Sequence, residues 1–245
     1  MSNRFSLNNK TILITGASSG LGRSIAIECS KMGAVVVISG RNKERLQDTY
    51  DNLINPLKSQ IVCDLTNMDS FNALCEELPL LDGVVMCAGI PNSTPVRHAS
   101  DIIMREVFEV NAFANFKLSR FLIAKNKINK GGSVVFVSSV ASNRPYVGNS
   151  IYSASKAAID SFAKVLALEV GYRKKIRVNC ISPGIVPTKA NDSAFSDDDL
   201  ANQENKIPLG FGKPIAIANG CVFLLSEASE WITGIDLVVD GGQLL

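Results

Sequence analysis

The sequence predicts an α/β fold, a doubly wound parallel sheet of about seven strands with helices on both faces. Short segments rich in β-branched residues alternate with longer segments of helical pattern, which is typical of βαβ units. The short segments are nearly continuous apolar runs, as expected for strands that helices cover on both faces. With 46% hydrophobic residues in a chain of 245, there is enough apolar material for one large core.

The short apolar segments are the predicted strands, and the longer segments between them are the predicted helices. The first helix, residues 21–32, carries Ile25 and Cys29 among small and polar residues and ends before Gly33, a common helix terminator. The sequence has no repeats and no low-complexity linker, so we expect one domain over residues 1–245. The predicted strands are residues 11–15, 35–38, 60–63, 83–86, 133–137, 177–180 and 237–239.

Charge and hydropathy argue against two classes of partner. The formal net charge is +2, and apart from residues 173–175 the lysines and arginines are spread along the chain, so we expect no nucleic-acid binding. No apolar run approaches the roughly 18 residues that span a bilayer. Residues 1–10 also lack the apolar stretch of a secretion signal. These features predict a cytoplasmic protein with no membrane association.

The cysteines and the single histidine narrow the chemistry. The six cysteines lie far apart without paired metal-ligand spacing, so we interpret them as reduced, structural residues. His98 is the only histidine, which rules out a Ser-His-Asp triad and a site with several histidine ligands. We therefore expect no metal, and proton transfer must use another side chain.

A glycine-rich turn follows the first predicted strand and leads directly into a helix. Its pattern is Gly-x-x-x-Gly-x-Gly, which allows a tight turn and lets backbone N–H groups approach a pyrophosphate at the positive end of the helix dipole. A glycine pattern alone is weak evidence, but this one lies on the first βα turn of a predicted parallel sheet. The predicted cofactor contacts here are Gly16, Ser18, Ser19, Gly20, Leu21 and Gly22.

The end of the second predicted strand favours NADP(H) over NAD(H). Folds that bind NAD usually place a carboxylate there for the ribose 2′-hydroxyl, whereas this strand ends in Gly40-Arg41. Gly40 leaves room for a 2′-phosphate and the Arg41 guanidinium can pair with it; the alternative is an exposed residue at a helix start. Asp64 and Leu65 follow the third strand, where the carboxylate either reaches the adenine amino group or caps a helix.

Tyr152 and Lys156 are the candidate acid/base pair. Their i to i+4 spacing places them on one face of the predicted helix 152–170. A phenol is a poor base at neutral pH, but a nearby ammonium stabilises the phenolate. Tyr-x-x-x-Lys occurs in many helices, so this interpretation needs partners.

Two further polar residues supply those partners. Ser139 follows the fifth strand, at the carboxyl edge of the sheet where ligands bind, and its hydroxyl either holds a substrate oxygen or bonds local backbone. Asn111 lies within an apolar helical stretch, an unfavourable place for an amide unless a water or backbone partner is present. We interpret Asn111 as part of a proton relay.

Over essentially its full length the chain resembles the short-chain dehydrogenase/reductase family, in its smaller single-domain, Rossmann-like branch. The resemblance implies hydride transfer at nicotinamide C4, with Tyr152 donating or taking the hydroxyl proton and Ser139 holding the oxygen. Lys156 would bind the nicotinamide ribose and favour the Tyr152 phenolate, and Asn111 would hold a water that links Lys156 to solvent. The matching elements are residues 15–22, Asp64, Ala88-Gly89, Asn111, Ser139, Tyr152, Lys156, Pro183-Gly184, Thr188 and Asp240-Gly241-Gly242.

The resemblance also implies further cofactor contacts. At two places the chain departs from the family's usual sequence. The irregular segment 187–208 would lie over the active site as a lid. Where the family usually has Asn-Asn-Ala-Gly, this chain has Met86-Cys87-Ala88-Gly89, and Ser19 stands where many NADP-preferring members carry a basic residue. The additional contacts implied for the cofactor are Ala88, Gly89, Pro183, Gly184, Val186 and Thr188.

Substrate and assembly are expected from the same resemblance. The chain is similar to 3-oxoacyl-carrier-protein reductases, and Lys130 with residues 173–175 forms either a basic patch for an acidic acyl-carrier protein or a plain solvated turn. The alternatives are a sugar, polyol or other small-alcohol dehydrogenase, and a non-catalytic NADP(H)-binding sensor. Apolar residues surround much of helix 152–170, so we expect a homodimer or homotetramer formed through this helix.

Overall fold

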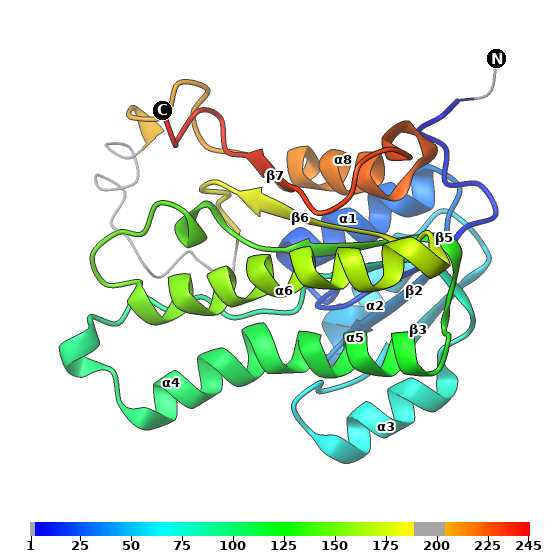
Figure 1. The fold of residues 1–245 in the computed structure, drawn as a ribbon, viewed down its shortest axis with the longest axis horizontal. Helices are drawn as coiled ribbons and strands as arrows, with labels where there is room; N and C mark the ends of the chain where they lie inside the picture. The colour runs from blue at the N-terminus through cyan, green and yellow to red at the C-terminus, as the bar shows by residue number, and fades with distance from the viewer. Residues whose placement is uncertain (1–2, 189–203) are drawn as a thin grey trace.

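A computed structural model of the protein describes residues 3–188 and 204–245. Its centre is one seven-stranded sheet in which every neighbouring pair is parallel, in the order β3-β2-β1-β4-β5-β6-β7 (Figure 1). This arrangement confirms the predicted fold class. The strands are β1 (Thr11–Ile14), β2 (Val35–Gly40), β3 (Lys58–Val62), β4 (Leu81–Met86), β5 (Ile128–Val137), β6 (Arg177–Pro183) and β7 (Asp236–Val239).

Helices cover both faces of this sheet. In Figure 1, α5 and α6 cross in front of the sheet, and α1 and α8 lie close together on its other side. Three 3₁₀ turns and one π-helical turn join or extend the helices. The elements are α1 (Gly20–Lys31), α2 (Lys43–Asp51), α3 (Met68–Glu77), η1 (Val96–His98), α4 (Asp101–Phe108), the π-helical η2 (Glu109–Phe113), α5 (Ala114–Ala124), η3 (Val140–Ser142), α6 (Ser150–Lys174), α8 (Pro214–Leu225) and η4 (Glu227–Ser229).

Two apolar cores fill the spaces between sheet and helices. Successive strand residues point to opposite faces, so Leu13 packs with α3, α5 and α6, whereas its neighbours Ile12 and Ile14 pack with α1, α2 and α8. All three side chains are fully buried, and burying a side chain of this size contributes about 1.5–3 kcal/mol. The continuous apolar runs in the sequence therefore reflect strands that are buried on both faces.

Six of the seven strands extend beyond their predicted bounds, and β3, β5 and β6 show the reasons. β3 begins at Lys58, because this edge strand alternates buried and exposed positions instead of forming a continuous apolar run. β5 begins at Ile128, and the register shifts at β4 before the strand reaches Ser133. β6 continues through Pro183, where it pairs with Val239 of β7. Polar and glycine residues concealed these extensions.

The cysteines are all free thiols, and five of the six are buried. Burial raises the pKa of the Cys29 thiol to about 12, with a smaller contribution from Glu28, so this thiol stays protonated and packs as an apolar group. Within residues 3–188 and 204–245, no three metal-ligating side chains are grouped in a way that could hold an ion. None of the helices in the same ranges combines the length and apolar character needed to cross a bilayer.

A buried polar cluster joins the end of β6 to β7 and α6. Asp236 Oδ2 accepts hydrogen bonds from Ser182 Oγ at 2.9 Å and from Asn143 Nδ2 at 3.3 Å. Asp236 Oδ1 and Asp160 Oδ1 are both buried with no partner among the described residues. Burial, and then the nearby Asp160 charge, raise the pKa of Asp236 above its ordinary value, although the Ser182 hydrogen bond opposes this shift. Ionised Asp236 therefore costs the fold stability.

We expect Asp236→Asn to raise the melting temperature by a few degrees at pH 7. The carboxyl pKa is higher in the folded chain than in the unfolded chain, so the cost of ionisation is absent at low pH and develops as the pH rises through the folded value. The amide keeps one oxygen for Ser182 and removes the negative charge beside Asp160. Thermal unfolding from pH 8 down toward pH 4 should show the gain narrowing, whereas Glu106→Gln, at an exposed position, should change little. An Asp236→Asn gain that does not depend on pH would contradict this explanation.

Candidate active site

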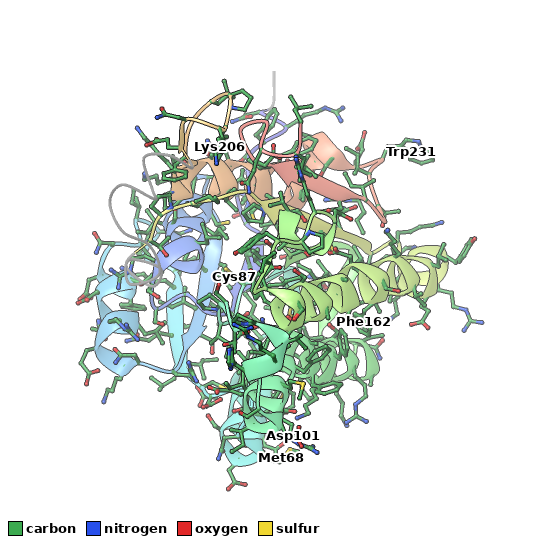
Figure 2. All side chains as sticks on the ribbon, turned by 90° about the vertical axis from the view of Figure 1, so that its left-hand side faces the viewer. Met68, Cys87, Asp101, Phe162, Lys206 and Trp231 are labelled. Atoms are coloured by element: carbon green, nitrogen blue, oxygen red, sulfur yellow. The ribbon has the colours of Figure 1, made fainter. Side chains whose placement is uncertain are left out.

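The predicted site residues lie on loops at one edge of the sheet. Because all seven strands are parallel, their carboxyl ends share this edge, and ligands of such sheets bind there. Figure 2 is viewed toward this edge, and Cys87, directly after β4, lies near its middle. The loops after β1, β4, β5 and β6 all converge on it.

The glycine turn packs tightly against the segment after β4. Gly16 and Gly20 have φ of +67° and +54°, a backbone region that side chains disfavour. A Cβ on Gly22 would lie 2.3 Å from the Gly16 carbonyl oxygen, and one on Gly16 would lie 2.9 Å from the Ala88 backbone. Thr15 Oγ1 accepts hydrogen bonds from the backbone N–H groups of Cys87, at 3.1 Å, and Ala88.

The backbone donors around this turn could hold a pyrophosphate. Ser19 is the residue before α1, so the free N–H groups of the first helical turn open onto the turn. The side chain of Thr188, which follows β6, lies 3.7 Å from the position a Gly20 Cβ would take. The structure therefore brings the predicted residues Ser18–Gly22, Ala88 and Thr188 together, and they fit the phosphates of a dinucleotide.

The end of β2 closes the same turn from the side. A Cβ on Gly40 would lie 3.1 Å from the Ser18 hydroxyl oxygen, and the Ala17 N–H donates to the Ser39 carbonyl at 2.9 Å. Arg41 is exposed beyond Gly40. The predicted adenosine-side residues Gly40 and Arg41 thus adjoin the predicted phosphate-side residue Ser18.

Asp64 forms a local turn next to Arg41, with Leu65 buried behind it. Its Oδ1 accepts from the backbone N–H and the hydroxyl of Thr66, at 2.9 and 2.7 Å. Burial alone would raise the pKa of Asp64, but these hydrogen bonds and the Arg41 charge hold it below its ordinary value. The residue that caps α3 is Asn67, so the helix-capping alternative for Asp64 was wrong.

Tyr152 and Lys156 lie on one face of α6, as the spacing predicted. Lys156 Nζ is 5.7 Å from the centre of the Tyr152 ring and donates to the Val137 carbonyl at 2.9 Å. Lys156 is only 5% exposed, whereas Tyr152 is partly open to solvent. A buried ammonium held by the last residue of β5 is thus fixed beside a phenol at the ligand-binding edge.

Asn111 lies in the π-helical turn η2, which the sequence did not reveal. Its buried side chain accepts from Ile90 N at 2.7 Å and donates to the Ile90 carbonyl and to Ser155 Oγ. The backbone partner that the sequence required is therefore Ile90. A Cβ on Gly89 would lie 3.2 Å from Asn111 Oδ1 and 3.4 Å from Lys156 Nζ, so Gly89 leaves room for both groups.

Ser139 follows β5 with extended backbone and is partly exposed. Its Oγ accepts from the Ala141 N–H at 3.2 Å, so the local backbone bond that the sequence offered as an alternative is present. The hydroxyl hydrogen donates to no acceptor among the described residues. The Ser139 hydroxyl therefore accepts one local hydrogen bond, and its hydrogen remains able to bond a further acceptor at the end of β5.

The segment after β6 runs from the sheet edge toward the glycine turn. Gly184 N donates to the Val239 carbonyl at 3.0 Å, and a Cβ on Gly184 would lie 2.8 Å from Asp240 Cα. Pro183 and Val186 are buried, and Thr188 reaches Gly20. Residues 189–203 of the predicted lid lie outside the described residues.

Cys87 and two residues that the sequence analysis did not select also belong to this edge. Burial raises the pKa of the Cys87 thiol to about 11, although the Lys156 charge opposes the shift. Ser155 bonds the Asn111 amide, and Arg23 donates to the Ser18 carbonyl at 2.9 Å. No local pattern identifies either of them, because a serine and an arginine on helices look like ordinary polar residues.

Comparison with known proteins assigns the chain. A family model described as Enoyl-(Acyl carrier protein) reductase matches residues 16–243. The 3-oxoacyl-[acyl-carrier-protein] reductase FabG of Rickettsia bellii is 37% identical over 240 residues, which cover 98% of both chains. A solved short chain dehydrogenase/reductase family protein superposes with a TM-score of 0.86 at 29% identity, covering 98% of this chain and 100% of the other. The chain belongs to the short-chain dehydrogenase/reductase family.

Membership in the short-chain dehydrogenase/reductase family makes the chain an oxidoreductase that binds a nicotinamide cofactor. A solved structure described as a putative NAD(P) dependent gluconate 5-dehydrogenase from Beutenbergia cavernae, with bound NADP at low occupancy, has a TM-score of 0.88 and 32% identity. It covers 99% of each chain. Relatives at similar identity therefore carry different substrate names on one short-chain dehydrogenase/reductase scaffold.

Gly22→Ala should weaken cofactor binding at least tenfold and lower the melting temperature. A methyl group 2.3 Å from the Gly16 carbonyl oxygen forces the turn to move, and its backbone is the predicted phosphate cradle. The matched control is Gly171→Ala on α6, where the nearest atom would be 4.0 Å away, so helix propensity predicts unchanged or slightly higher stability. Fluorescence titration with NADPH and thermal unfolding measure both effects; unchanged affinity in Gly22→Ala would show that this turn does not bind the cofactor.

Proposed function

We propose that this chain is an NADP(H)-dependent reductase that interconverts a carbonyl and a secondary alcohol. The observation that carries the proposal is the buried Lys156 ammonium fixed 5.7 Å from the Tyr152 ring, at the edge where the glycine turn opens. The bound nicotinamide would supply or accept the hydride at the carbonyl carbon. The residues of the chain then have to orient the substrate oxygen and move its proton.

Tyr152 and Ser139 would divide this work. The Ser139 hydroxyl donates to the substrate oxygen and orients it, and the Tyr152 phenol gives that oxygen its proton during reduction and takes it back during oxidation. The Lys156 ammonium stabilises the phenolate that remains after proton transfer, and the Val137 carbonyl keeps the ammonium in place. Asn111 holds the backbone of residues 89–90 beside Lys156, which is the position a proton relay needs.

NADP(H) is the proposed cofactor in preference to NAD(H). β2 ends at Gly40 without a carboxylate, and the exposed Arg41 guanidinium follows it. A carboxylate at this position would repel a 2′-phosphate, whereas a guanidinium can pair with it. NADP in the Beutenbergia cavernae relative supports the same preference.

A 3-oxoacyl thioester is the proposed substrate class, on the strength of the Rickettsia bellii relative. The predicted basic patch, Lys130 with residues 173–175, is exposed, and Lys174 Nζ donates to Asn126 Oδ1 at 2.8 Å. This contact keeps the end of α6 near the turn after α5, where an acidic acyl-carrier protein would dock. The gluconate 5-dehydrogenase name of another relative keeps sugar and polyol oxidation as the second candidate.

Tyr152→Phe should reduce turnover by a factor on the order of 10²–10⁴ without changing NADPH affinity, because only the proton-transferring hydroxyl is removed. NADPH oxidation should be assayed with 3-oxoacyl thioesters, keto sugar acids and simple ketones, and affinity by fluorescence titration. Tyr172→Phe is the matched control, since Tyr172 is 79% exposed at the far end of α6.

Three outcomes separate the alternatives. Turnover of keto sugar acids without thioester turnover would replace the acyl substrate and keep the mechanism. No turnover with any substrate but tight NADPH binding would favour the non-catalytic sensor. Equal rates for Tyr152→Phe and the parent would exclude Tyr152 as the proton donor.

We further propose a homodimer or homotetramer assembled through α5 and α6. An apolar groove of about 560 Å³ runs between these helices, floored by Phe116 and Phe162, whose rings stack 4.2 Å apart. Val165 and Leu168 are 54% and 61% exposed on the same stretch of α6. An apolar surface of this kind is typical of a contact between proteins.

Val165→Glu should shift the sedimentation profile toward the monomer, because it places an ionised side chain on the exposed apolar face of α6 that the assembly would bury. Leu57→Glu, at a position 65% exposed between α2 and β3, should leave the parent assembly intact. A monomeric parent chain would refute the proposed assembly.

A further inference from the structure

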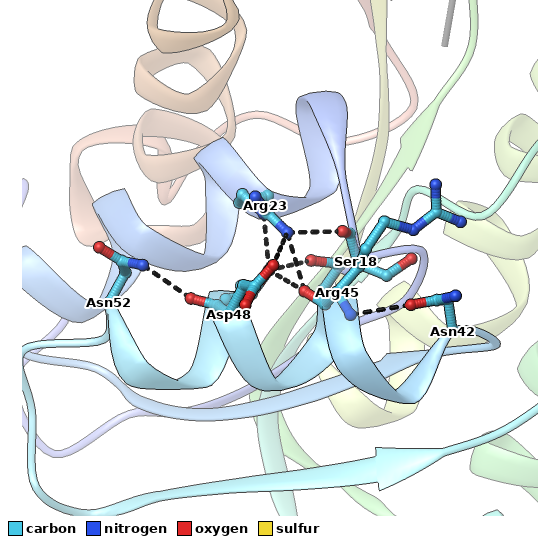
Figure 3. A network of polar contacts seen from close by, with 8 residues as sticks. Ser18, Arg23, Asn42, Arg45, Asp48 and Asn52 are labelled. Atoms are coloured by element: carbon cyan, nitrogen blue, oxygen red, sulfur yellow. Dashed lines mark hydrogen bonds and ion pairs between the residues drawn. The ribbon is translucent and has the colours of Figure 1, made fainter. Parts of the chain in front are cut away.

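A network behind the glycine turn fixes the first turn of α2. The Arg45 N–H donates to Asn42 Oδ1 at 2.8 Å, and Asn42 is the N-cap residue of α2. The Arg45 carbonyl accepts from Arg23 Nη2 at 2.8 Å. The backbone of Arg45 is therefore held from both sides (Figure 3).

Arg23 connects this helical turn to the glycine turn. The Nη2 atom that bonds the Arg45 carbonyl also donates to the Ser18 carbonyl at 2.9 Å, so these two carbonyls lie on either side of one nitrogen. Arg23 Nε donates to Thr49 Oγ1 at 2.9 Å, and the Thr49 hydroxyl donates to the Ala17 carbonyl at 2.8 Å. The Arg45 backbone thus lies close to that of Ser18, the residue that faces Gly40.

The Arg45 guanidinium has no partner within the part of the chain that the structure describes. Its natural ion-pair partner on a helix, Asp48 at i+3, lies 3.8 Å from Arg23 Nη2 instead. No hydrogen bond or ion pair of the guanidinium occurs in residues 3–188 and 204–245, and the side chain is exposed. Figure 3 shows it extending alongside Ser18, with its guanidinium on the Asn42 side of the network.

Arg41, which follows the last residue of β2, would need a second cation to balance the charge of a bound phosphate. Its charge already interacts with the Asp64 carboxylate, which it helps to keep ionised. A phosphate monoester carries about −1.5 to −2 charges near pH 7, more than one guanidinium can balance. The glycine turn, residues 15–22, contributes no cationic side chain.

We propose that Arg45, together with Arg41, is a cationic ligand for the 2′-phosphate of NADP(H). Arg23 is then a positioning residue, because it pairs with Asp48 and fixes the Arg45 backbone through its Nε and Nη2 atoms. This inference rests on the proposed NADP(H) preference and makes Arg45 a determinant of cofactor specificity.

The test measures binding as well as activity. Calorimetry with 2′,5′-ADP and with 5′-AMP isolates the 2′-phosphate, and NADPH and NADH titrations extend the comparison to the cofactor. Arg45→Gln should weaken 2′,5′-ADP and NADPH binding about tenfold, with a matching rise in the KM for NADPH, and leave the binding of 5′-AMP and NADH unchanged. Parent affinity for 2′,5′-ADP should fall with added salt more steeply than that of Arg45→Gln. The charge-matched control is Arg105→Gln on exposed α4, which should change none of these values.

Three outcomes distinguish failure of the Arg45 proposal from failure of the NADP(H) assignment. If Arg41→Gln loses the preference for 2′,5′-ADP and Arg45→Gln does not, Arg45 is not a ligand although the NADP(H) assignment holds. If the parent binds 2′,5′-ADP no better than 5′-AMP, the NADP(H) assignment itself fails. Equal losses for 5′-AMP and 2′,5′-ADP in Arg45→Gln would indicate a disturbed turn and overturn the specificity role.

Discussion

The buried Lys156 ammonium is the group on which the arrangement of this site depends. Removing an ammonium from water is costly unless its charge is met by polar groups held in position. The Val137 carbonyl at the end of β5 meets it directly. A Cβ on Gly89 would crowd both Lys156 and Asn111, so this position has to be glycine or another residue must move. One buried charge therefore dictates the packing of α6, β5 and the segment after β4.

Residues in the loops and first helical turns at the carboxyl ends of the strands were predictable from the sequence, because a parallel sheet collects those ends at one edge. Gly16–Gly22, Ser139, Tyr152 and Lys156 all lie where the pattern put them. Residues that act by holding others were not predictable. The π-helical turn that holds Asn111 has no compositional signal, and Arg23 contacts the Arg45 carbonyl, 22 residues along the chain, which only the folded structure brings beside it.

The two ends of the proposed cofactor site use charge in opposite ways. At Lys156 the charge is buried and rigid, which suits a group that must be ready for a phenolate without reorganisation. At Arg41 and Arg45 the guanidinium groups are exposed, and only their backbone positions are fixed. Exposed charges are screened and contribute modest energies, so under the proposal selectivity at that end would depend on the number of cations that converge on the phosphate.

The same division explains why the scaffold constrains the reaction more than the substrate. In the proposed mechanism, proton transfer uses Tyr152, Lys156 and Ser139, which the end of β5 and the start of α6 position. Residues between η3 and α6, such as Tyr146 and Val147, are 55% and 95% exposed and carry few packing constraints. A change there alters the shape offered to a substrate without disturbing the buried ammonium. This difference between buried and exposed residues is consistent with one scaffold carrying relatives named 3-oxoacyl-[acyl-carrier-protein] reductase and gluconate 5-dehydrogenase.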